Sequence, residues 1–404
     1  MPKISQRGHE VPASPIRKLT PFAADAKKRG VKVYHLNIGQ PDLPTPQKAL
    51  DALKTIDRKT LEYSPSQGYA PLREKMCGYY SRFDVTVSPD EIIITTGGSE
   101  ALLLTFLSCF NPGDEIIMTE PGYANYLSFA VTAGITVRTV TSTIENGFAL
   151  PSVEDFEAAI TPRTKAILIC NPNNPTGYLY SEEELQRLRE IVLAHDLFLI
   201  ADEVYREFVY NGKPYLSAMC LEGLEQNVIM VDSVSKRYSE CGIRIGMVVT
   251  RNKEVHDTIL KFCQARLSPP LLGQIVAEAS IEGTEDYARE CFEEYKARRD
   301  FFIEGLNRIP GVYSPVPQGA FYTVVSLPVD DAEDFCKWLL TDFEYRETPD
   351  SQPETVMMAP CAGFYSNHEL GRRQVRMAYV LKLEDLGRAL KVLETALSVY
   401  NANK

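Results

Sequence analysis

The chain has 404 residues, of which 44% are hydrophobic and 24% are charged, a composition typical of a soluble globular protein. Its net charge of -11 argues against nucleic acid or an anionic membrane surface as the main partner. No apolar run approaches the roughly 18 residues of a membrane span, and the N-terminus lacks the apolar core of a signal peptide. The nine cysteines and five histidines lie scattered. We therefore expect a cytoplasmic protein with neither a disulfide framework nor a metal site.

Residues 1–45 are rich in proline, with a helix expected over residues 21–29 and a strand over residues 33–38. This composition predicts an arm that lies on other surfaces and has no core of its own.

From residue 46 onward, apolar strands alternate with helical segments. The expected strands cover residues 91–95, 115–119, 135–140, 165–170, 198–201, 228–231 and 246–250, and the expected helices cover residues 46–54, 71–83, 99–110 and 181–195. Many of these strands are continuously apolar, which indicates a sheet with both faces covered. The fold class is therefore α/β, with a mostly parallel sheet covered by helices on both faces.

Beyond about residue 281 the pattern changes to long charged helices and short strands. The expected helices cover residues 287–307, 332–340 and 383–400, and the expected strands cover residues 320–327 and 376–380. We expect a large cofactor-binding domain over residues 46–280. Residues 1–45 and 281–404 would form the N-terminal arm and a smaller α+β domain.

Polar residues follow the strands at the edge of the sheet where ligands bind in open α/β folds. Ser99 opens a helix after Gly97-Gly98, where free backbone N–H groups suit a phosphate. Neither GxGxxG nor GxxxxGK[ST] is present, so a dinucleotide site and a P-loop have no support. Further along, the strand ends are followed by Asn174, by Asp202 and Tyr205, and by Ser233, Lys236 and Arg244.

Pyridoxal phosphate needs such a set of groups. Its phosphate needs donors, its ring nitrogen a carboxylate, its phenolic oxygen hydrogen-bond donors and its aldehyde an amine that forms a Schiff base. In that order the candidates are Gly98, Ser99, Ser233 and Arg244; Asp202; Tyr205 and Asn174; and Lys236. Each short stretch alone is also explained by a helix cap or a turn, so the assignment depends on the whole set.

At this point the chain resembles the fold-type I, class I/II aminotransferases of the aspartate aminotransferase superfamily. The similar stretches occur in family order over nearly the whole chain, at residues 37–42, 63–68, 97–102, 121–123, 171–177, 201–205, 233–236, 242–246 and 375–379. The resemblance implies a transferase of nitrogenous groups that uses pyridoxal 5'-phosphate, bound as a Schiff base to Lys236.

The resemblance also implies individual roles. Lys236 would move the Cα proton of the substrate, a task worth about 10²–10⁴-fold in rate. Tyr123 would stack on the cofactor ring. Tyr63 would reach the phosphate from a neighbouring subunit, which implies a homodimer with shared active sites. Arg376 would bind the substrate α-carboxylate, with Gly39 and Asn174 nearby.

The preferred substrate is the open question. In one bacterial subgroup of this family a lysine at the position of Ser99 binds the distal carboxylate of the substrate, and the serine removes that argument for a dicarboxylic donor. Arg266 could substitute from the partner subunit, although its offset to the Pro-Pro pair differs from that of the animal-type enzymes. The alternative for Arg266 is a surface or interface ion pair, and Arg17 in the arm is a weaker candidate for the distal carboxylate.

The expected reaction is transamination between an L-amino acid, either aspartate or a neutral or aromatic one, and a 2-oxo acid such as 2-oxoglutarate. One alternative is a β-eliminating C–S lyase with the same cofactor and fold. A non-enzymatic alternative is an aminotransferase-like ligand sensor, which the acidic charge and the lack of room for a DNA-binding module disfavour.

Overall fold

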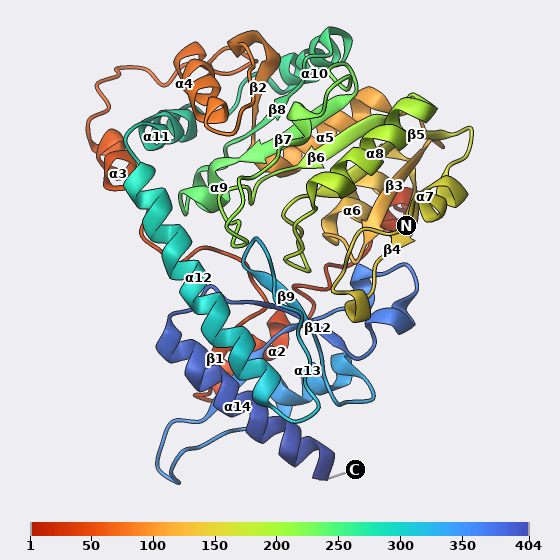
Figure 1. Cartoon of the computed structure of the whole chain (residues 1–404). Coiled ribbons are helices and arrows are strands. Elements are labelled where there is room, and N and C mark those ends of the chain that lie inside the picture. The colour runs from red at the N-terminus through yellow and green to blue at the C-terminus, as the bar shows by residue number, and fades with distance from the viewer. Residues whose placement is uncertain (1, 403–404) are drawn as a thin grey trace.

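The computed structural model describes residues 2–402 of the chain. In Figure 1 a helix-covered sheet forms the upper part of the molecule, and the long helix α12 (Glu285–Arg308) runs down beside a smaller lower part.

The upper part is built around a seven-stranded sheet with the strand order β2-β8-β7-β6-β5-β3-β4. Its strands are β2 (Ile92–Thr95), β3 (Glu115–Glu120), β4 (Thr136–Thr141), β5 (Thr164–Cys170), β6 (Phe198–Asp202), β7 (Val228–Ser233) and β8 (Gly246–Val249). Strand β8 runs antiparallel to both of its neighbours, and the remaining pairs are parallel. The prediction of a mostly parallel sheet is confirmed.

Helices cover both faces of this sheet because successive strand side chains point to opposite sides. Ile93 packs into one buried cluster, whereas its neighbours Ile92 and Ile94 pack into another. The first face is covered by α5 (Gly97–Cys109), α6 (Asn125–Ala133) and α10 (Lys253–Arg266). The second face is covered by α4 (Ala70–Ser81), α7 (Val153–Ala159), α8 (Glu182–His195) and α11 (Leu271–Ile281). This two-sided burial explains the continuously apolar strands.

The lower part contains a three-stranded antiparallel sheet with the order β11-β12-β9. Its elements are β9 (Tyr322–Ser326), β11 (Ala359–Pro360), β12 (Gln374–Ala378), α13 (Ala332–Thr341) and α14 (Leu383–Ala402). Many of its buried side chains belong to the same cluster as the first face of the large sheet, so the two parts share a continuous core. Val324 of β9 and Ala359 of β11 belong to a separate, smaller cluster.

The N-terminal arm is tied to the lower part by a strand pair. Strand β1 (Lys32–His35) pairs in parallel with β10 (Glu354–Met357). The strand predicted over residues 33–38 therefore ends at His35, and the residues after it form a loop that borders a large cavity. The remaining helices are α1 (Gln6–Glu10), α2 (Thr20–Lys28), α3 (Gln47–Lys54) and α9 (Val234–Arg237).

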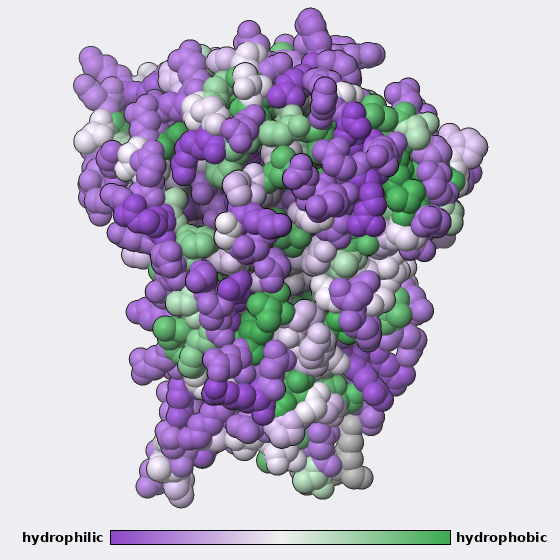
Figure 2. Space-filling model, viewed as in Figure 1, coloured by the Kyte–Doolittle hydropathy of each residue, from purple (hydrophilic) through white to green (hydrophobic). Residues whose placement is uncertain are grey.

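Within residues 2–402, no helix combines the length and the apolar character that crossing a membrane requires. The same residues contain no cluster of three or more histidine, cysteine or acidic side chains that could hold a metal ion. The face shown in Figure 2 is mostly hydrophilic, with its hydrophobic areas broken up by polar ones.

Candidate active site

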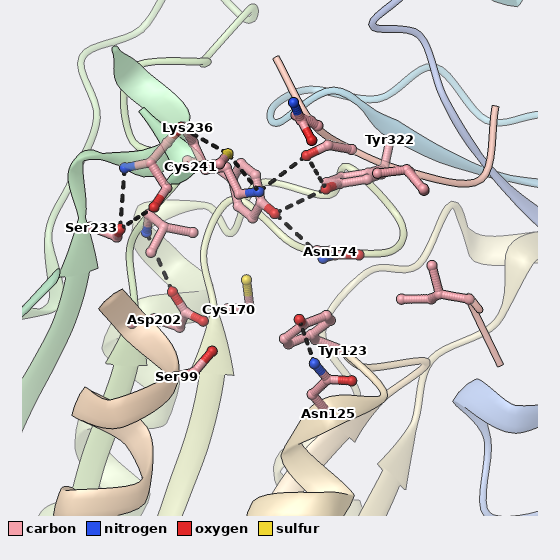
Figure 3. A pocket seen from close by; sticks show the side chains of 18 of the residues that line it. Ser99, Tyr123, Asn125, Cys170, Asn174, Asp202, Ser233, Lys236, Cys241 and Tyr322 are labelled. Atoms are coloured by element: carbon pink, nitrogen blue, oxygen red, sulfur yellow. Dashed lines mark hydrogen bonds between the residues drawn. The ribbon is translucent and has the colours of Figure 1, made fainter. Parts of the chain in front are cut away.

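A cavity of about 740 Å³ lies where the carboxyl ends of the large sheet meet the lower part of the molecule. Its lining includes Asp202 at the end of β6, Ser233 at the end of β7 and Lys236 in α9. Tyr322 of β9 and Arg376 of β12 enter it from the smaller sheet. Figure 3 shows that Asp202, Lys236 and Tyr322, from distant parts of the chain, lie around one space. All of the predicted site residues in this chain lie here except Tyr63 and Arg266.

Lys236 is positioned by a short helix that begins directly after β7. Ser233 caps this helix, because its hydroxyl accepts a hydrogen bond from the Ser235 backbone N–H at 3.1 Å. The Lys236 Nζ donates to the Gly39 carbonyl at 3.0 Å. A Cβ at Gly39 would lie 1.7 Å from the Tyr322 hydroxyl, so only glycine allows the backbone this close. The amine is therefore held inside the cavity by a main-chain carbonyl.

Asp202 is a buried carboxylate with no cationic partner among residues 2–402. Its Oδ2 accepts a hydrogen bond from the Tyr126 hydroxyl at 2.7 Å. Burial raises the pKa of Asp202 to about 6, although the Tyr126 hydrogen bond acts in the opposite direction. The buried guanidinium groups of Arg206 and Arg237 pair instead with Asp232, which lies deeper in the core. Asp202 thus faces the cavity as an acceptor suited to a cationic ring nitrogen.

A chain of hydrogen bonds crosses the cavity wall. The Asn174 Nδ2 donates to the Tyr205 hydroxyl at 3.4 Å. The Tyr205 hydroxyl lies 3.2 Å from the Tyr322 hydroxyl. Tyr322 in turn donates to the Gly39 carbonyl at 3.3 Å. Burial raises the pKa of the Tyr205 phenol well above its ordinary value, so the hydroxyl stays protonated and available as a donor.

Hydrogen-bond donors collect at the start of α5. Gly98 and Ser99 occupy its first turn, where the helix dipole favours an anion. A Cβ at Gly97 would lie 2.4 Å from the Arg244 Nη2, which shows how closely this guanidinium approaches the helix start. The Ser233 hydroxyl is a further polar group at this end of the cavity. It lies 2.8 Å from the Ile245 carbonyl and 2.8 Å from the Ser235 hydroxyl. This arrangement suits a phosphate.

Arg376 is 2% exposed and points into the cavity from β12. Its Nη1 donates to the Asn174 Oδ1 at 3.1 Å, and its Nη2 donates to the Asn37 carbonyl. Its Nε is buried without a hydrogen-bond partner among the described residues. Because an orphaned buried donor is unfavourable, this guanidinium is suited to an acceptor that enters the cavity, such as a carboxylate.

Three further predicted residues lie in different settings. Tyr123 lines the cavity, and its hydroxyl accepts a hydrogen bond from the Asn125 Nδ2 at 2.7 Å. Tyr63 is 77% exposed and lies outside the cavity lining. Arg266 lies 3.5 Å from Glu100 of its own chain and donates to the Ile94 carbonyl at 3.3 Å. The predicted roles of Tyr63 and Arg266 involve a second subunit, and they stay predictions.

The sequence reasoning gave no role to several polar side chains of the cavity, among them Tyr126, Asn125, Tyr322 and Cys241. Tyr126 and Asn125 follow the Pro121-Gly-Tyr123 stretch and begin α6, so a helix placed there would have turned them toward Tyr123. Tyr322 carries no comparable signal, because its contacts with Tyr205 and Gly39 cross from one part of the chain to another. Cys241 contacts Ser235 and Lys236, which lie close to it in the sequence.

The residues present fit pyridoxal phosphate. The cavity combines a phosphate cradle, a buried carboxylate without a counter-charge and an amine, and burial holds the phenols nearby in their protonated form. The guanidinium of Arg376, whose Nε has no hydrogen-bond partner among the described residues, lies in the same space.

Comparison with known proteins agrees with this chemistry. The family model for class I and II aminotransferases matches residues 31–392. The aspartate aminotransferase of Thermotoga maritima is 30% identical over 399 residues, which are 98% of this chain and 99% of that protein. The aspartate aminotransferase of Bacillus subtilis is 30% identical over 399 residues, which are 96% of this chain and 97% of that one.

Solved structures give the same result for the fold. The aspartate aminotransferase of Thermus thermophilus with maleate matches with a TM-score of 0.88 at 28% identity, over 98% of this chain and 100% of that one. An alanine aminotransferase from Pyrococcus furiosus matches with a TM-score of 0.88 at 30% identity, again over 98% of this chain and 100% of that one.

Proposed function

The chain belongs to the class I and II aminotransferases, which use pyridoxal phosphate, and we propose that it transfers the amino group of an L-amino acid to a 2-oxo acid such as 2-oxoglutarate. The observation that carries this proposal is the placement of Lys236 in one cavity with Arg376 and with the buried Asp202, which has no cationic partner in the described part of the chain.

Pyridoxal phosphate, when bound, supplies an electron sink for the pair left behind when the Cα–H bond of an amino acid breaks. Asp202 would keep the ring nitrogen cationic, which this sink requires. Asn174 and Tyr205 would donate hydrogen bonds to the phenolic oxygen. Gly98, Ser99, Ser233 and Arg244 would hold the phosphate at the start of α5.

Two residues act on the substrate directly. Arg376 would bind the α-carboxylate through its unpaired Nε and fix the amino acid in one orientation. Lys236, whose Nζ lies in the same cavity, would take the proton from Cα. The Tyr123 ring on the cavity wall would limit the movement of the bound groups.

We also propose the division into a large cofactor-binding domain over residues 46–280 and an arm plus small domain over residues 1–45 and 281–404. The seven-stranded sheet falls within the first range. The pairing of β1 with β10 supports assigning the arm to the second.

A homodimer with shared sites is the assembly that we propose, in the cytoplasm. Exposed apolar side chains gather near α3 and α11, which pack against each other. They include Leu50, Leu53, Leu267 and Leu272, all more than 40% exposed in the single chain. Burial of such a group against a second copy would also bring the exposed Tyr63 to the neighbouring cavity.

The reaction is tested with a donor panel of aspartate, alanine, phenylalanine, tyrosine, leucine, kynurenine and methionine. The loss of cofactor absorbance in the first half-reaction and the formation of glutamate from 2-oxoglutarate are measured. No absorbance change with any donor would refute the proposal and leave a ligand sensor as the better interpretation. Release of pyruvate and ammonia from cystathionine without transamination would identify a C–S lyase.

Shared sites are tested by mixing two inactive variants, Lys236→Ala and Tyr63→Ala. A hybrid dimer would contain one site with an intact Lys236 from one chain and an intact Tyr63 from the other. Recovery of activity after subunit exchange is expected. A monomer in analytical ultracentrifugation, or no recovery in hybrids isolated by two affinity tags, would refute shared sites.

A further inference from the structure

Arg17 is a cationic residue at the mouth of the cavity. It has no part in the proposed catalytic and cofactor-binding roles. It lies between Ser14 and Lys18 in the N-terminal arm, and its side chain is exposed while lining the cavity. Its guanidinium makes no hydrogen bond or ion pair with any residue in the described part of the chain. Lys18, by contrast, pairs with Glu333.

The charges in the cavity show which group Arg17 could bind. The charged side chains that line it are Arg17, Lys236, Arg244 and Arg376, with Asp202 as the lone carboxylate among the described lining residues. In the proposed function the phosphate engages Arg244, the ring nitrogen pairs with Asp202, and the α-carboxylate engages Arg376. Lys236 takes the proton from the substrate Cα. Arg17 has no partner in this assignment, and its positive charge is complementary to a further negative charge on the substrate.

The arm holds Arg17 in a fixed relation to the α-carboxylate site. The Asn37 carbonyl accepts a hydrogen bond from Arg376, and the Asn37 side-chain amide donates to the Ile16 carbonyl at 3.1 Å. One residue therefore connects the guanidinium of β12 to the residue preceding Arg17. The backbone N–H groups of Arg17 and Lys18 both donate to the Ser14 carbonyl, at 3.1 and 3.0 Å, which closes this turn.

Tyr123 lies near both guanidinium groups and can add a neutral donor. Burial raises the pKa of Tyr123 to about 12, and the positive charges of Arg376 and Arg17 act in the opposite direction. The phenol is protonated at neutral pH, and since its oxygen accepts the Asn125 amide, its own proton is free for an acceptor in the cavity.

Alternative positions for a distal-carboxylate site are weaker in this chain. Ser99 is uncharged and lies at the start of α5, where the phosphate is expected. Arg266 already lies beside Glu100 and donates to two backbone carbonyls of its own chain, at 3.4 Å to Ser66 and 3.3 Å to Ile94.

We propose that Arg17 determines substrate specificity by binding the side-chain carboxylate of dicarboxylic substrates, so that four- and five-carbon dicarboxylic amino and 2-oxo acids are preferred. This inference rests on the proposed function and deepens it.

The test measures binding and turnover in the holoenzyme. Binding of maleate, an unreactive dicarboxylate, is measured by calorimetry. Single-turnover kcat/KM is measured for aspartate and for alanine. Arg17→Gln should weaken maleate binding and lower kcat/KM for aspartate by about tenfold, the effect of one charge-assisted hydrogen bond at a partly solvated site. The value for alanine should change less than about threefold, because alanine has no second carboxylate.

Two variants serve as controls. Arg17→Lys keeps the charge and should recover part of the maleate affinity. Arg7→Ala removes an exposed arginine of the same arm that does not line the cavity, and it should leave both measurements unchanged.

Several results would overturn the proposal: unchanged maleate affinity in Arg17→Gln, equal losses for aspartate and alanine, or a wild type without preference for dicarboxylates. Loss of maleate binding in Arg266→Ala but not in Arg17→Gln would assign the distal carboxylate to Arg266 instead. If the wild type transaminates and Arg17→Gln behaves like the wild type, this inference is refuted and the proposed function stands. A wild type that converts no amino acid refutes the proposed function.

Discussion

Replacement of Asp202 by asparagine separates the effect of this buried carboxylate on folding stability from its role in turnover. In the cofactor-free protein, burial raises the pKa of Asp202 from 3.8 to about 6. The folded state then binds this proton more tightly than the unfolded state. Ionisation of the group therefore opposes folding, and the loss of stability develops as the pH rises from about 4 to about 6. A shift of about two pKa units corresponds to about 3 kcal/mol at neutral pH.

Asparagine removes the charge and keeps the acceptor. Its Oδ1 can still accept from the Tyr126 hydroxyl, which lies 2.7 Å from the present carboxylate oxygen. Cofactor-free Asp202→Asn should therefore be more stable than the wild type by about 3 kcal/mol near pH 8, and the difference should disappear near pH 4. Turnover of the cofactor-loaded variant should fall at least about 100-fold, because the ring nitrogen loses its counter-charge.

The assay is urea unfolding of the cofactor-free proteins at fixed protein concentration across this pH range. Asp257→Asn is the matched control, since it removes a partly exposed carboxylate whose pKa is lowered by its hydrogen bond from Lys253. A stability difference between Asp202→Asn and the wild type that does not change with pH would refute the assigned burial cost. An unchanged turnover would refute the role of Asp202 toward the ring nitrogen.

Three further predictions concern the same cavity. Arg376→Lys should lower kcat/KM for every donor by about 100-fold, because lysine lacks the buried Nε that would contact the α-carboxylate; single-turnover kinetics check this, and a loss confined to dicarboxylic donors would contradict it. Lys236→Ala should lower turnover at least about 100-fold and abolish covalent cofactor attachment, which borohydride reduction and peptide mass spectrometry detect; a labelled peptide elsewhere would argue against Lys236. Tyr126→Phe should destabilise the cofactor-free protein by about 2 kcal/mol at neutral pH in urea unfolding, because the ionised Asp202 loses a donor; unchanged stability would count against this hydrogen bond.

Local sequence patterns were enough for the large sheet and for the residues that come directly after its strands. Asp202 ends a strand whose other residues are apolar, and Lys236 lies just beyond the end of the next strand. Parallel strands bring their carboxyl ends to one edge, so motifs that lie far apart in the sequence become neighbours in space. The order of these motifs along the chain also carries the family resemblance.

The predicted boundaries were less accurate where tertiary contacts end an element. The strand expected to reach residue 38 stops at His35. Beyond it, the Asn37 side chain and carbonyl bond to Ile16 and Arg376, and Gly39 lies against Tyr322. These contacts draw the chain away from the strand pairing, and no local pattern indicates them.

The sequence by itself determined the fold class, the family and most of the groups that suit the cofactor, because these depend on periodicity and on the residues at the carboxyl end of each strand. The tertiary structure alone decided the surroundings of three residues. Tyr126 contacts Asp202 across 76 positions of sequence, and Arg266 is engaged by its own chain. The Arg17 guanidinium lines the cavity without a partner among the residues that the structure describes. The partners of a long side chain are set by which distant elements pack beside it, and that packing is a property of the whole folded core.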